Sequence, residues 1–222
     1  MTGPRVVAID GPSGAGKSTV ARGVADALGL SVLDTGAMYR AVTHAALEQG
    51  ITLTDEAACS ELAHSTEIEV NDRVRVDGKD VSAAIRGSGV TAAVSTVSAH
   101  PGVRAVLVGR QRTWVAEHGG GVVEGRDIGT VVFPDTPVKV FLTASDDERA
   151  RRRQRDEAGA SRPADLEEVR ESLSQRDRLD STRTSSPLQQ AADALVLDTT
   201  SMTADDAITE IVARARAAWG AS

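Results

Sequence analysis

One glycine-rich stretch near the N-terminus constrains this chain more than any other feature. The residues Gly11-Pro12-Ser13-Gly14-Ala15-Gly16-Lys17-Ser18 fit the pattern G-x-x-x-x-G-K-[ST], which is typical of a P-loop. The apolar run 6–9 before it predicts a buried strand, and the apolar spacing over 17–28, followed by Gly29, predicts a helix. Strand, glycine turn and helix N-terminus together form an anion site, because backbone N–H groups and the helix dipole both favour phosphate.

Two side chains of this stretch have the chemistry that a nucleoside triphosphate requires. Lys17 would reach the β- and γ-phosphates, and the Ser18 hydroxyl would face Mg²⁺. The alternative is a glycine-rich turn with a chance lysine. The flanking strand and helix favour the phosphate interpretation, but they do not say how the triphosphate is used.

The rest of the chain predicts an α/β fold, a three-layer sandwich around a five-stranded parallel sheet. The strands are expected at 6–9, 31–34, 122–124, 138–142 and 194–198. Helices are expected at 17–28, 36–49, 55–62, 88–97, 101–118, 145–155, 165–180 and 203–219, with Gly119-Gly120-Gly121 ending the fifth. Aromatic residues are scarce, so the core must be aliphatic, which suits a parallel sheet buried on both faces. Ligands should gather at the carboxyl ends of the strands, where Asp10, Asp34 and Arg126-Asp127 lie.

We expect one domain over 1–222. Two of its segments depart from the alternation of strands and helices. Polar and apolar residues alternate over 67–76 around Asn71-Asp72, which predicts a β-hairpin. A hairpin does not belong in a parallel sheet core, so 62–96 is expected to be an inserted lobe. The arginine-rich helix and the break at 159–163 predict a mobile lid over about 149–170.

Charge and cysteine content narrow the partners. The net charge of −7 argues against nucleic acid and anionic membranes. Cys59 is the single cysteine, and the four histidines form no metal-ligand spacing. We expect neither a signal peptide nor a membrane-spanning run. We therefore expect a cytoplasmic monomer with small-molecule substrates.

The basic residues are almost all arginines, since the only lysines are Lys17, Lys79 and Lys139. Genome composition is one explanation, and phosphate recognition by guanidinium groups is the other. The arginines cluster at 149–155 and again at 176–183. A solvated helix face would explain single members of the first cluster, whereas the whole cluster favours a lid that excludes water from a phosphoryl transfer. The N-K-x-D motif of signalling GTPases is absent, and the only D-x-x-G match, Asp26 to Gly29, falls at the end of the first helix. Length and strand count are small for a motor ATPase, which leaves a small phosphotransferase.

Four sequence blocks make this prediction specific. They are IDGPSGAGKS at 9–18, DTGAMYR at 34–40, EGRDIGTVVFPD at 124–135 and RDRLDSTR at 176–183. In these blocks, which span nearly the whole chain in the same order, the sequence resembles bacterial cytidylate kinase, the (d)CMP kinase of the nucleoside monophosphate kinase superfamily. The resemblance implies the conversion of ATP and CMP or dCMP to ADP and CDP or dCDP with Mg²⁺. It also implies a five-stranded core, a lid and an enlarged monophosphate-binding lobe.

The resemblance implies roles for individual residues as well. The donor nucleotide would be held by Gly11, Pro12, Ser13, Gly14, Ala15, Gly16, Lys17, Ser18, Thr19, Arg152 and Arg153. The acceptor would contact Thr35, Tyr39, Arg40, Ser95, Arg104, Arg126, Asp127, Arg176, Asp180 and Arg183. Lys17, Arg126, Arg152 and Arg183 would act on the transferring group, and Ser18 would hold Mg²⁺, although some family members have glycine there.

The acceptor residues suit cytidine monophosphate chemically. Asp127 would accept from the cytosine N4 amine, Ser95 and the arginines would meet O2 and N3, and Asp180 would bind the sugar hydroxyl. Without the resemblance, Asp127 could cap a turn, Asp180 could end a helix and Tyr39 could belong to the core. A kinase for another nucleoside monophosphate is the main alternative, and a non-catalytic nucleotide-binding regulator is the third.

Overall fold

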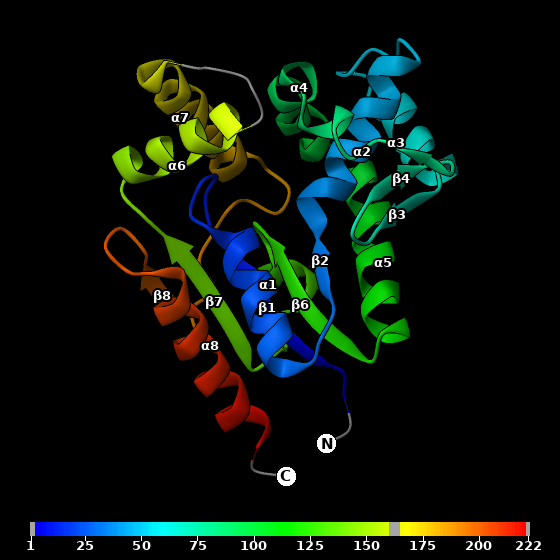
Figure 1. Ribbon diagram of the computed structural model, residues 1–222. Coiled ribbons are helices and arrows are strands. Elements are labelled where there is room, and N and C mark those ends of the chain that lie inside the picture. The colour runs from blue at the N-terminus through cyan, green and yellow to red at the C-terminus, as the bar shows by residue number, and fades with distance from the viewer. Residues whose placement is uncertain (1–2, 160–164, 221–222) are drawn as a thin grey trace.

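The computed structural model describes residues 3–159 and 165–220, and its centre is a five-stranded parallel sheet in the order β2-β6-β1-β7-β8. This confirms the predicted fold class, and Figure 1 shows the strands side by side. The strands are β1 (Arg5–Asp10), β2 (Val32–Asp34), β6 (Gly120–Gly125), β7 (Val138–Thr143) and β8 (Leu195–Asp198). Gly120 and Gly121, which we expected to end a helix, instead begin β6, because pairing with β1 extends the strand.

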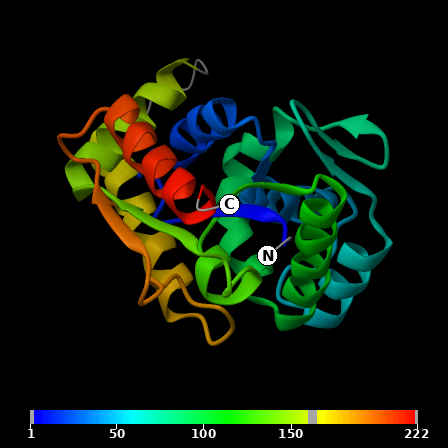
Figure 2. The ribbon, with the colours of Figure 1, turned by 90° about the horizontal axis from the view of Figure 1, so that it is seen from below.

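The sheet is covered on both faces, and the alternation along β1 shows why. Val6 and Ala8 pack into one apolar cluster with helices α2 (Thr35–Glu48), α3 (Glu56–Ser65), α4 (Ser88–Ala99) and α5 (Pro101–Glu117). Val7 and Ile9 pack into a second cluster with α1 (Lys17–Leu28) and α8 (Ala204–Trp219). Figure 2 shows α1 and α8 together on one side of the strands. Successive side chains of β1 thus point to opposite faces, and all from Val6 to Asp10 are buried, as a sheet covered on both faces requires.

A small antiparallel sheet stands apart from the main one. It contains β3 (Ile68–Val70), β4 (Val74–Val76) and β5 (Lys79–Asp80), so the expected hairpin strands pair and gain a third strand that we did not predict. The short turn η1 (Ala84–Arg86) connects it to α4. Val70, Val74 and Val76 attach this sheet to the cluster around α2.

Two helices complete the other side of the molecule. They are α6 (Asp146–Gly159) and α7 (Leu166–Thr182), which pack through Ala150, Val169 and Leu173. Most of the expected break at 159–163 lies outside the described residues. In Figure 1, α6 and α7 rise above one end of the sheet and α2–α4 above the other, with the carboxyl ends of the strands between them. None of the helices over 3–159 and 165–220 combines the length and apolar character needed to cross a membrane.

Candidate active site

The P-loop runs from the end of β1 to the start of α1 and turns on glycines with positive φ. Gly14 and Gly16 have φ values of 78° and 87°, a left-handed conformation that glycine adopts without steric cost. Lys17 is buried beneath the loop, and its Nζ donates to the Pro12 carbonyl at 2.7 Å. Burial, with the nearby Arg126 guanidinium, lowers the pKa of Lys17 to about 7. A bound phosphate would favour the charged form of Lys17 and would raise its pKa again.

A cavity of about 450 Å³ lies over the loop and reaches the end of β8. This volume falls within the range of ligand sites. It contains most of the expected donor residues, whereas Gly11, Pro12 and Ser13 lie in the same loop but outside its lining. The lining includes Gly14, Ala15, Gly16, Lys17, Ser18, Thr19, Arg152, Arg153 and Thr199.

Arg152 reaches this donor cavity in a defined orientation. Its Nη1 donates to the Thr199 hydroxyl at 2.9 Å, and its Nε donates to Glu148 at 3.0 Å. The Thr199 hydroxyl lies 3.3 Å from the Ala15 carbonyl of the P-loop. Thr199, just after β8, therefore connects α6 with the P-loop. The sequence around it, Asp-Thr-Thr-Ser, carries no motif that predicts this role.

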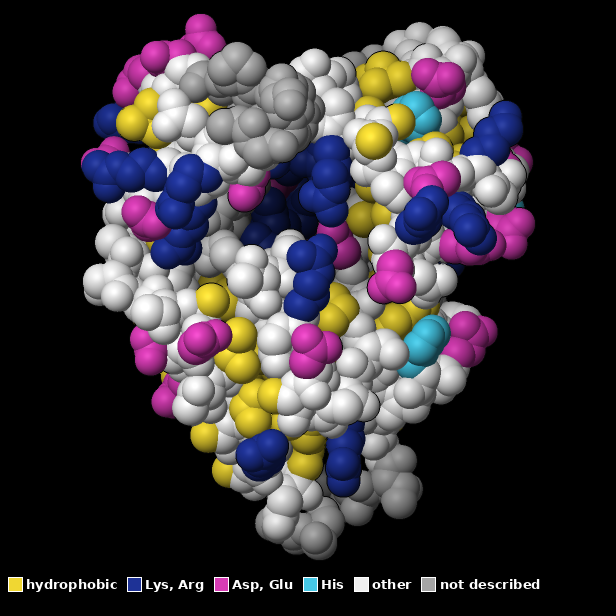
Figure 3. All heavy atoms as spheres, viewed as in Figure 1, with side chains coloured by type: hydrophobic (Ala, Val, Ile, Leu, Met, Phe, Trp, Pro, Cys, Tyr) yellow, Lys and Arg dark blue, Asp and Glu magenta, His cyan; other side chains and the backbone are white. Residues whose placement is uncertain are grey.

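A second, narrower cavity of about 80 Å³ adjoins the first, and Lys17 lines both. Every acceptor residue expected from the sequence lies in its wall. They are Thr35, Tyr39, Arg40, Ser95, Arg104, Arg126, Asp127, Arg176, Asp180 and Arg183. Figure 3 shows Lys and Arg side chains gathered around the hollow between the two upper lobes of the molecule.

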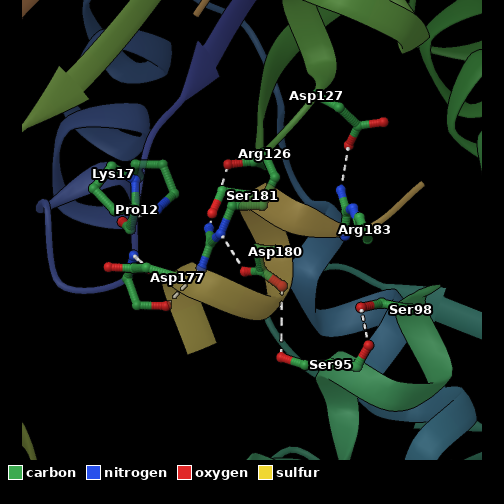
Figure 4. A network of polar contacts seen from close by, with 12 residues as sticks. Pro12, Lys17, Ser95, Ser98, Arg126, Asp127, Asp177, Asp180, Ser181 and Arg183 are labelled. Atoms are coloured by element: carbon green, nitrogen blue, oxygen red, sulfur yellow. Dashed lines mark hydrogen bonds and ion pairs between the residues drawn. The ribbon is translucent and has the colours of Figure 1, made fainter. Parts of the chain in front are cut away.

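Two buried carboxylates organise the arginines of this acceptor cavity. Asp127 pairs with Arg104 and lies 3.6 Å from Nη2 of Arg183. Asp180 accepts from Arg126 Nε at 3.0 Å and lies 3.5 Å from the Ser95 hydroxyl. Figure 4 shows Asp180 between Arg126 and Ser95. Both aspartates therefore have partners far away in the sequence, besides any part they take in ending a turn or a helix.

The arginines carry an electrostatic cost that an anion would relieve. Burial and the neighbouring Arg176 lower the pKa of Arg40 to about 9, and burial and Arg126 lower that of Arg176 to about 10. Burial and Arg104 also lower the pKa of Arg183. Nε of Arg176 finds no hydrogen-bond partner among the described residues. Cations that repel one another inside a cavity attract a phosphate, which replaces repulsion by pairing.

Tyr39 belongs to both the cavity and the core. Its ring packs in the cluster around α2, and the Arg104 guanidinium lies 5.2 Å from the ring centroid. This separation allows a cation–π contact. Tyr39 therefore lies where both a core residue and an acceptor-binding residue would lie.

Two carboxylates at strand ends were quoted in the sequence blocks without an assigned role. Glu124 accepts from the Ser18 hydroxyl at 2.9 Å, and burial with the nearby Asp34 raises the pKa of Glu124 to about 7. Asp10 accepts from the backbone N–H groups of Ile128 and Gly129, both at 2.8 Å, and burial raises its pKa to about 6. The strand-end rule that selected Asp127 would also have selected Glu124.

The donor set suits Mg²⁺. The Ser18 hydroxyl in the donor cavity and the Glu124 carboxylate in the wall of the acceptor cavity offer hard oxygen atoms that are in contact with each other. Mg²⁺ is usually bound by one or two such groups together with phosphates and water. In the part of the chain that the structure describes, no three His, Cys, Asp or Glu side chains converge to hold a metal by themselves. Ser18 and Glu124 are oxygen groups of the kind that bind Mg²⁺ together with phosphates.

Comparisons with known proteins place the chain in a family. The family model described as cytidylate kinase matches residues 7–217. The chain is 52% identical to a cytidylate kinase of Mycolicibacterium paratuberculosis over 91% of each chain. It is 50% identical to a bifunctional pantoate ligase/cytidylate kinase of Synechocystis over 93% of this chain, but it spans only 42% of that protein. In fold it is similar to an uncharacterized protein from Eubacterium ventriosum, with a TM-score of 0.53 and 13% identity over 94% of this chain and 96% of that one.

Proposed function

The chain belongs to the cytidylate kinase family, and we propose that it transfers the γ-phosphoryl group of ATP to CMP or dCMP, giving ADP and CDP or dCDP. The observation that carries the proposal is the pair of adjoining cavities. One lies over the P-loop, the other contains buried arginines and two carboxylates, and Lys17 lines both. Two anions brought together in this way need positioning and charge neutralisation more than covalent catalysis.

On the acceptor side, each chemical feature of CMP has a matching group. Asp127 would accept from the cytosine N4 amine, and Ser95 and Arg104 would meet the ring acceptors. Asp180 would bind a sugar hydroxyl. The α-phosphate would lie among cavity groups that share the ability to donate to phosphate oxygens: Thr35, Tyr39, Arg40, Arg126 and Arg176. This phosphate is already ionised at neutral pH, so it can attack without a general base.

On the donor side, the loop amides and Lys17 would hold the triphosphate of ATP. Mg²⁺, when bound, would neutralise charge on the phosphate oxygens, and Ser18 with Glu124 would hold it. Arg183 lies in the acceptor cavity and Arg152 in the donor cavity, so the two arginines would stabilise the transferring group from opposite sides.

The remaining expectations concern domains and context. We propose that 62–96 forms the lobe that closes around the monophosphate, and that 149–170 forms a lid that excludes water. Arg40 supports the first, because its Nη1 donates to the Ile85 carbonyl and the Thr91 hydroxyl of the lobe, both at 3.0 Å. The lid includes 160–164, which lie outside the described residues. We also expect a cytoplasmic monomer without nucleic-acid or membrane partners, which gel filtration and a nucleic-acid binding assay would test.

The experiment measures ADP formation from ATP with CMP, dCMP, UMP and AMP as acceptors. We expect CMP and dCMP to be used best, and Asp127→Ala to lower kcat/KM for CMP by about 10- to 100-fold, because a buried acceptor is lost. Asp135→Ala is the matched control, since Asp135 lies in the same sequence block but is exposed. Faster turnover of AMP than of CMP would favour the alternative nucleoside monophosphate kinase. ATP binding without any transfer would favour the regulator.

A further inference from the structure

Ser13, at the tip of the P-loop, is held at all three of its polar groups by side chains from distant segments. Its N–H donates to Asp177 Oδ1 at 3.1 Å, and its carbonyl accepts from Arg149 Nη1 at 3.0 Å. Its hydroxyl accepts from Arg126 Nη2 at 2.7 Å. A loop residue with no regular backbone partners thus has its position defined by α6, α7 and the segment after β6.

Arg149 and Asp177 form a unit. Arg149 Nη1 also pairs with Asp177 Oδ2, and Arg149 Nη2 donates to Asp146 at 2.6 Å. The side chains of Arg149 and Asp177 are only 8% and 17% exposed, so water competes little for these bonds. Asp146 is 72% exposed and adds little to the pair.

The backbones of the loop and α6 are also in contact. A Cβ atom on Gly14 would lie 3.0 Å from the Arg149 carbonyl oxygen and 3.1 Å from its Cβ. The first turn of α6 therefore packs directly on the loop. The side chain of Arg149 is buried, whereas that of Arg151, in the same arginine cluster, is 60% exposed.

Ser13 connects this pair to the acceptor cavity. The same Arg126 that donates to the Ser13 hydroxyl donates through Nε to Asp180. In Figure 4, Asp177 lies near Pro12 and Lys17, and Arg126 lies near Asp180. We propose that Arg149 and Asp177 are positioning residues, which hold Ser13 so that the donor loop and Arg126 keep a fixed separation. This inference rests on the proposed function.

The consequence is an effect on turnover more than on substrate affinity. Neither Arg149 nor Asp177 lines the acceptor cavity or the donor cavity. Their loss would keep the side chains that line each cavity but would loosen the position of the P-loop relative to Arg126. A misplacement of about 1 Å between reacting groups lowers the rate by about 100-fold.

The experiment compares Asp177→Ala, Arg149→Met, their double variant and the control Arg178→Met, which changes an exposed arginine next to Asp177. Transfer to CMP by the wild-type chain is measured first, so that failure of the proposed function is recognised separately. We expect each single variant to lower kcat per folded molecule by about 10- to 100-fold, with KM for ATP and CMP within about threefold of wild type. The double variant should lose little more than the worse single variant, because the two residues act as one unit.

Rescue by a conservative change gives a second measurement. Arg149→Lys keeps a cation that can donate to the Ser13 carbonyl or to Asp177 but lacks the planar fork, so we expect an intermediate kcat. The folded fraction is measured by circular dichroism under assay conditions. Unchanged kcat in Asp177→Ala, a loss that only tracks the folded fraction, or additive losses in the double variant would each overturn the proposal.

Discussion

The hydroxyl of Ser18 donates to Oε2 of Glu124 at 2.9 Å, which joins the first turn of α1 to the end of β6. The two residues are 106 positions apart in the sequence. The carboxylate that it holds lies in the wall of the acceptor cavity near Lys17, and burial raises the pKa of this carboxylate to about 7.

Glu124→Gln should stabilise the protein at high pH. The folded-state pKa of Glu124, about 7, lies above its ordinary value of 4.5. The stability that comes from protonating Glu124 is therefore complete below pH 4.5 and is lost as the pH rises through 7. Glutamine resembles the protonated acid. At pH 8 we therefore expect the free energy of unfolding of the variant to be about 1–3 kcal/mol higher than that of wild type, and at pH 4.5 we expect the two free energies to be similar. Urea unfolding at both pH values measures this. A difference that does not depend on pH would contradict it.

Asp180→Asn should impair the acceptor side. The variant leaves the partly buried Arg126 guanidinium without its charged partner and changes the group expected to meet the sugar hydroxyl. We expect kcat/KM for CMP to fall by about 10- to 100-fold, with a different ratio of CMP to dCMP use. Asp193→Asn is the control, because that carboxylate pairs with Lys139 but is 64% exposed. Equal kcat/KM for CMP in the two variants would contradict a role of Asp180 in binding CMP.

Thr199→Val should weaken the donor side alone. Valine keeps the shape of threonine but cannot accept from Arg152 Nη1. Valine also cannot donate to the Ala15 or Thr143 carbonyl. The lost hydrogen bond to Arg152, worth about 1 kcal/mol, should raise the Kd for a non-hydrolysable ATP analogue at least fivefold and leave the Kd for CMP unchanged. Isothermal titration measures both constants. Thr209→Val on the exposed face of α8 provides the control, and the prediction is wrong if both valine variants bind the analogue equally well.

Gly11→Ala should destabilise the fold itself. Gly11 has φ of 150°, and a Cβ atom there would lie 2.1 Å from the Leu142 carbonyl oxygen of β7. The backbone of the loop or of β7 must move, so we expect a loss of at least 2–3 kcal/mol in unfolding free energy and of ATP binding. Gly109→Ala, at an open position inside α5, should instead be neutral or stabilise by about 0.5–1 kcal/mol. Thermal unfolding of the two variants should therefore shift in opposite directions or differ by at least several degrees.

The features that the sequence predicted well are local or belong to long blocks. The P-loop and the five parallel strands depend on short-range periodicity and on one ordered motif. The structure also brings every residue expected at the acceptor to one cavity, while the roles of these residues stay predictions. Most of the features that were missed depend on partners far away in the sequence. The π-helical turn η2 (Ile128–Val132) forms where Asp10, 118 positions earlier, accepts from the Ile128 N–H.

Asp177 shows the same limitation. It stands in a quoted block between two arginines, and nothing local distinguishes it from a solvated helix residue. Its partner Ser13 is 164 positions away, so only the three-dimensional arrangement reveals the contact. β5 was missed for a different reason, since two residues carry too little periodicity to predict a strand.

The place of β1 in the sheet has a consequence for biosynthesis. β1 pairs with β6 on one side and β7 on the other, in registers such as Ile9 with Glu124 and Ile9 with Val140. The ribosome makes β1 long before β6 and β7 emerge. For about half of translation or more, the nascent chain therefore contains an apolar, aggregation-prone segment that lacks both of its partner strands. Such segments are where chaperones bind and where chains aggregate. Slow or interrupted synthesis between β1 and β6 should therefore reduce the yield of folded protein more than a pause after β7.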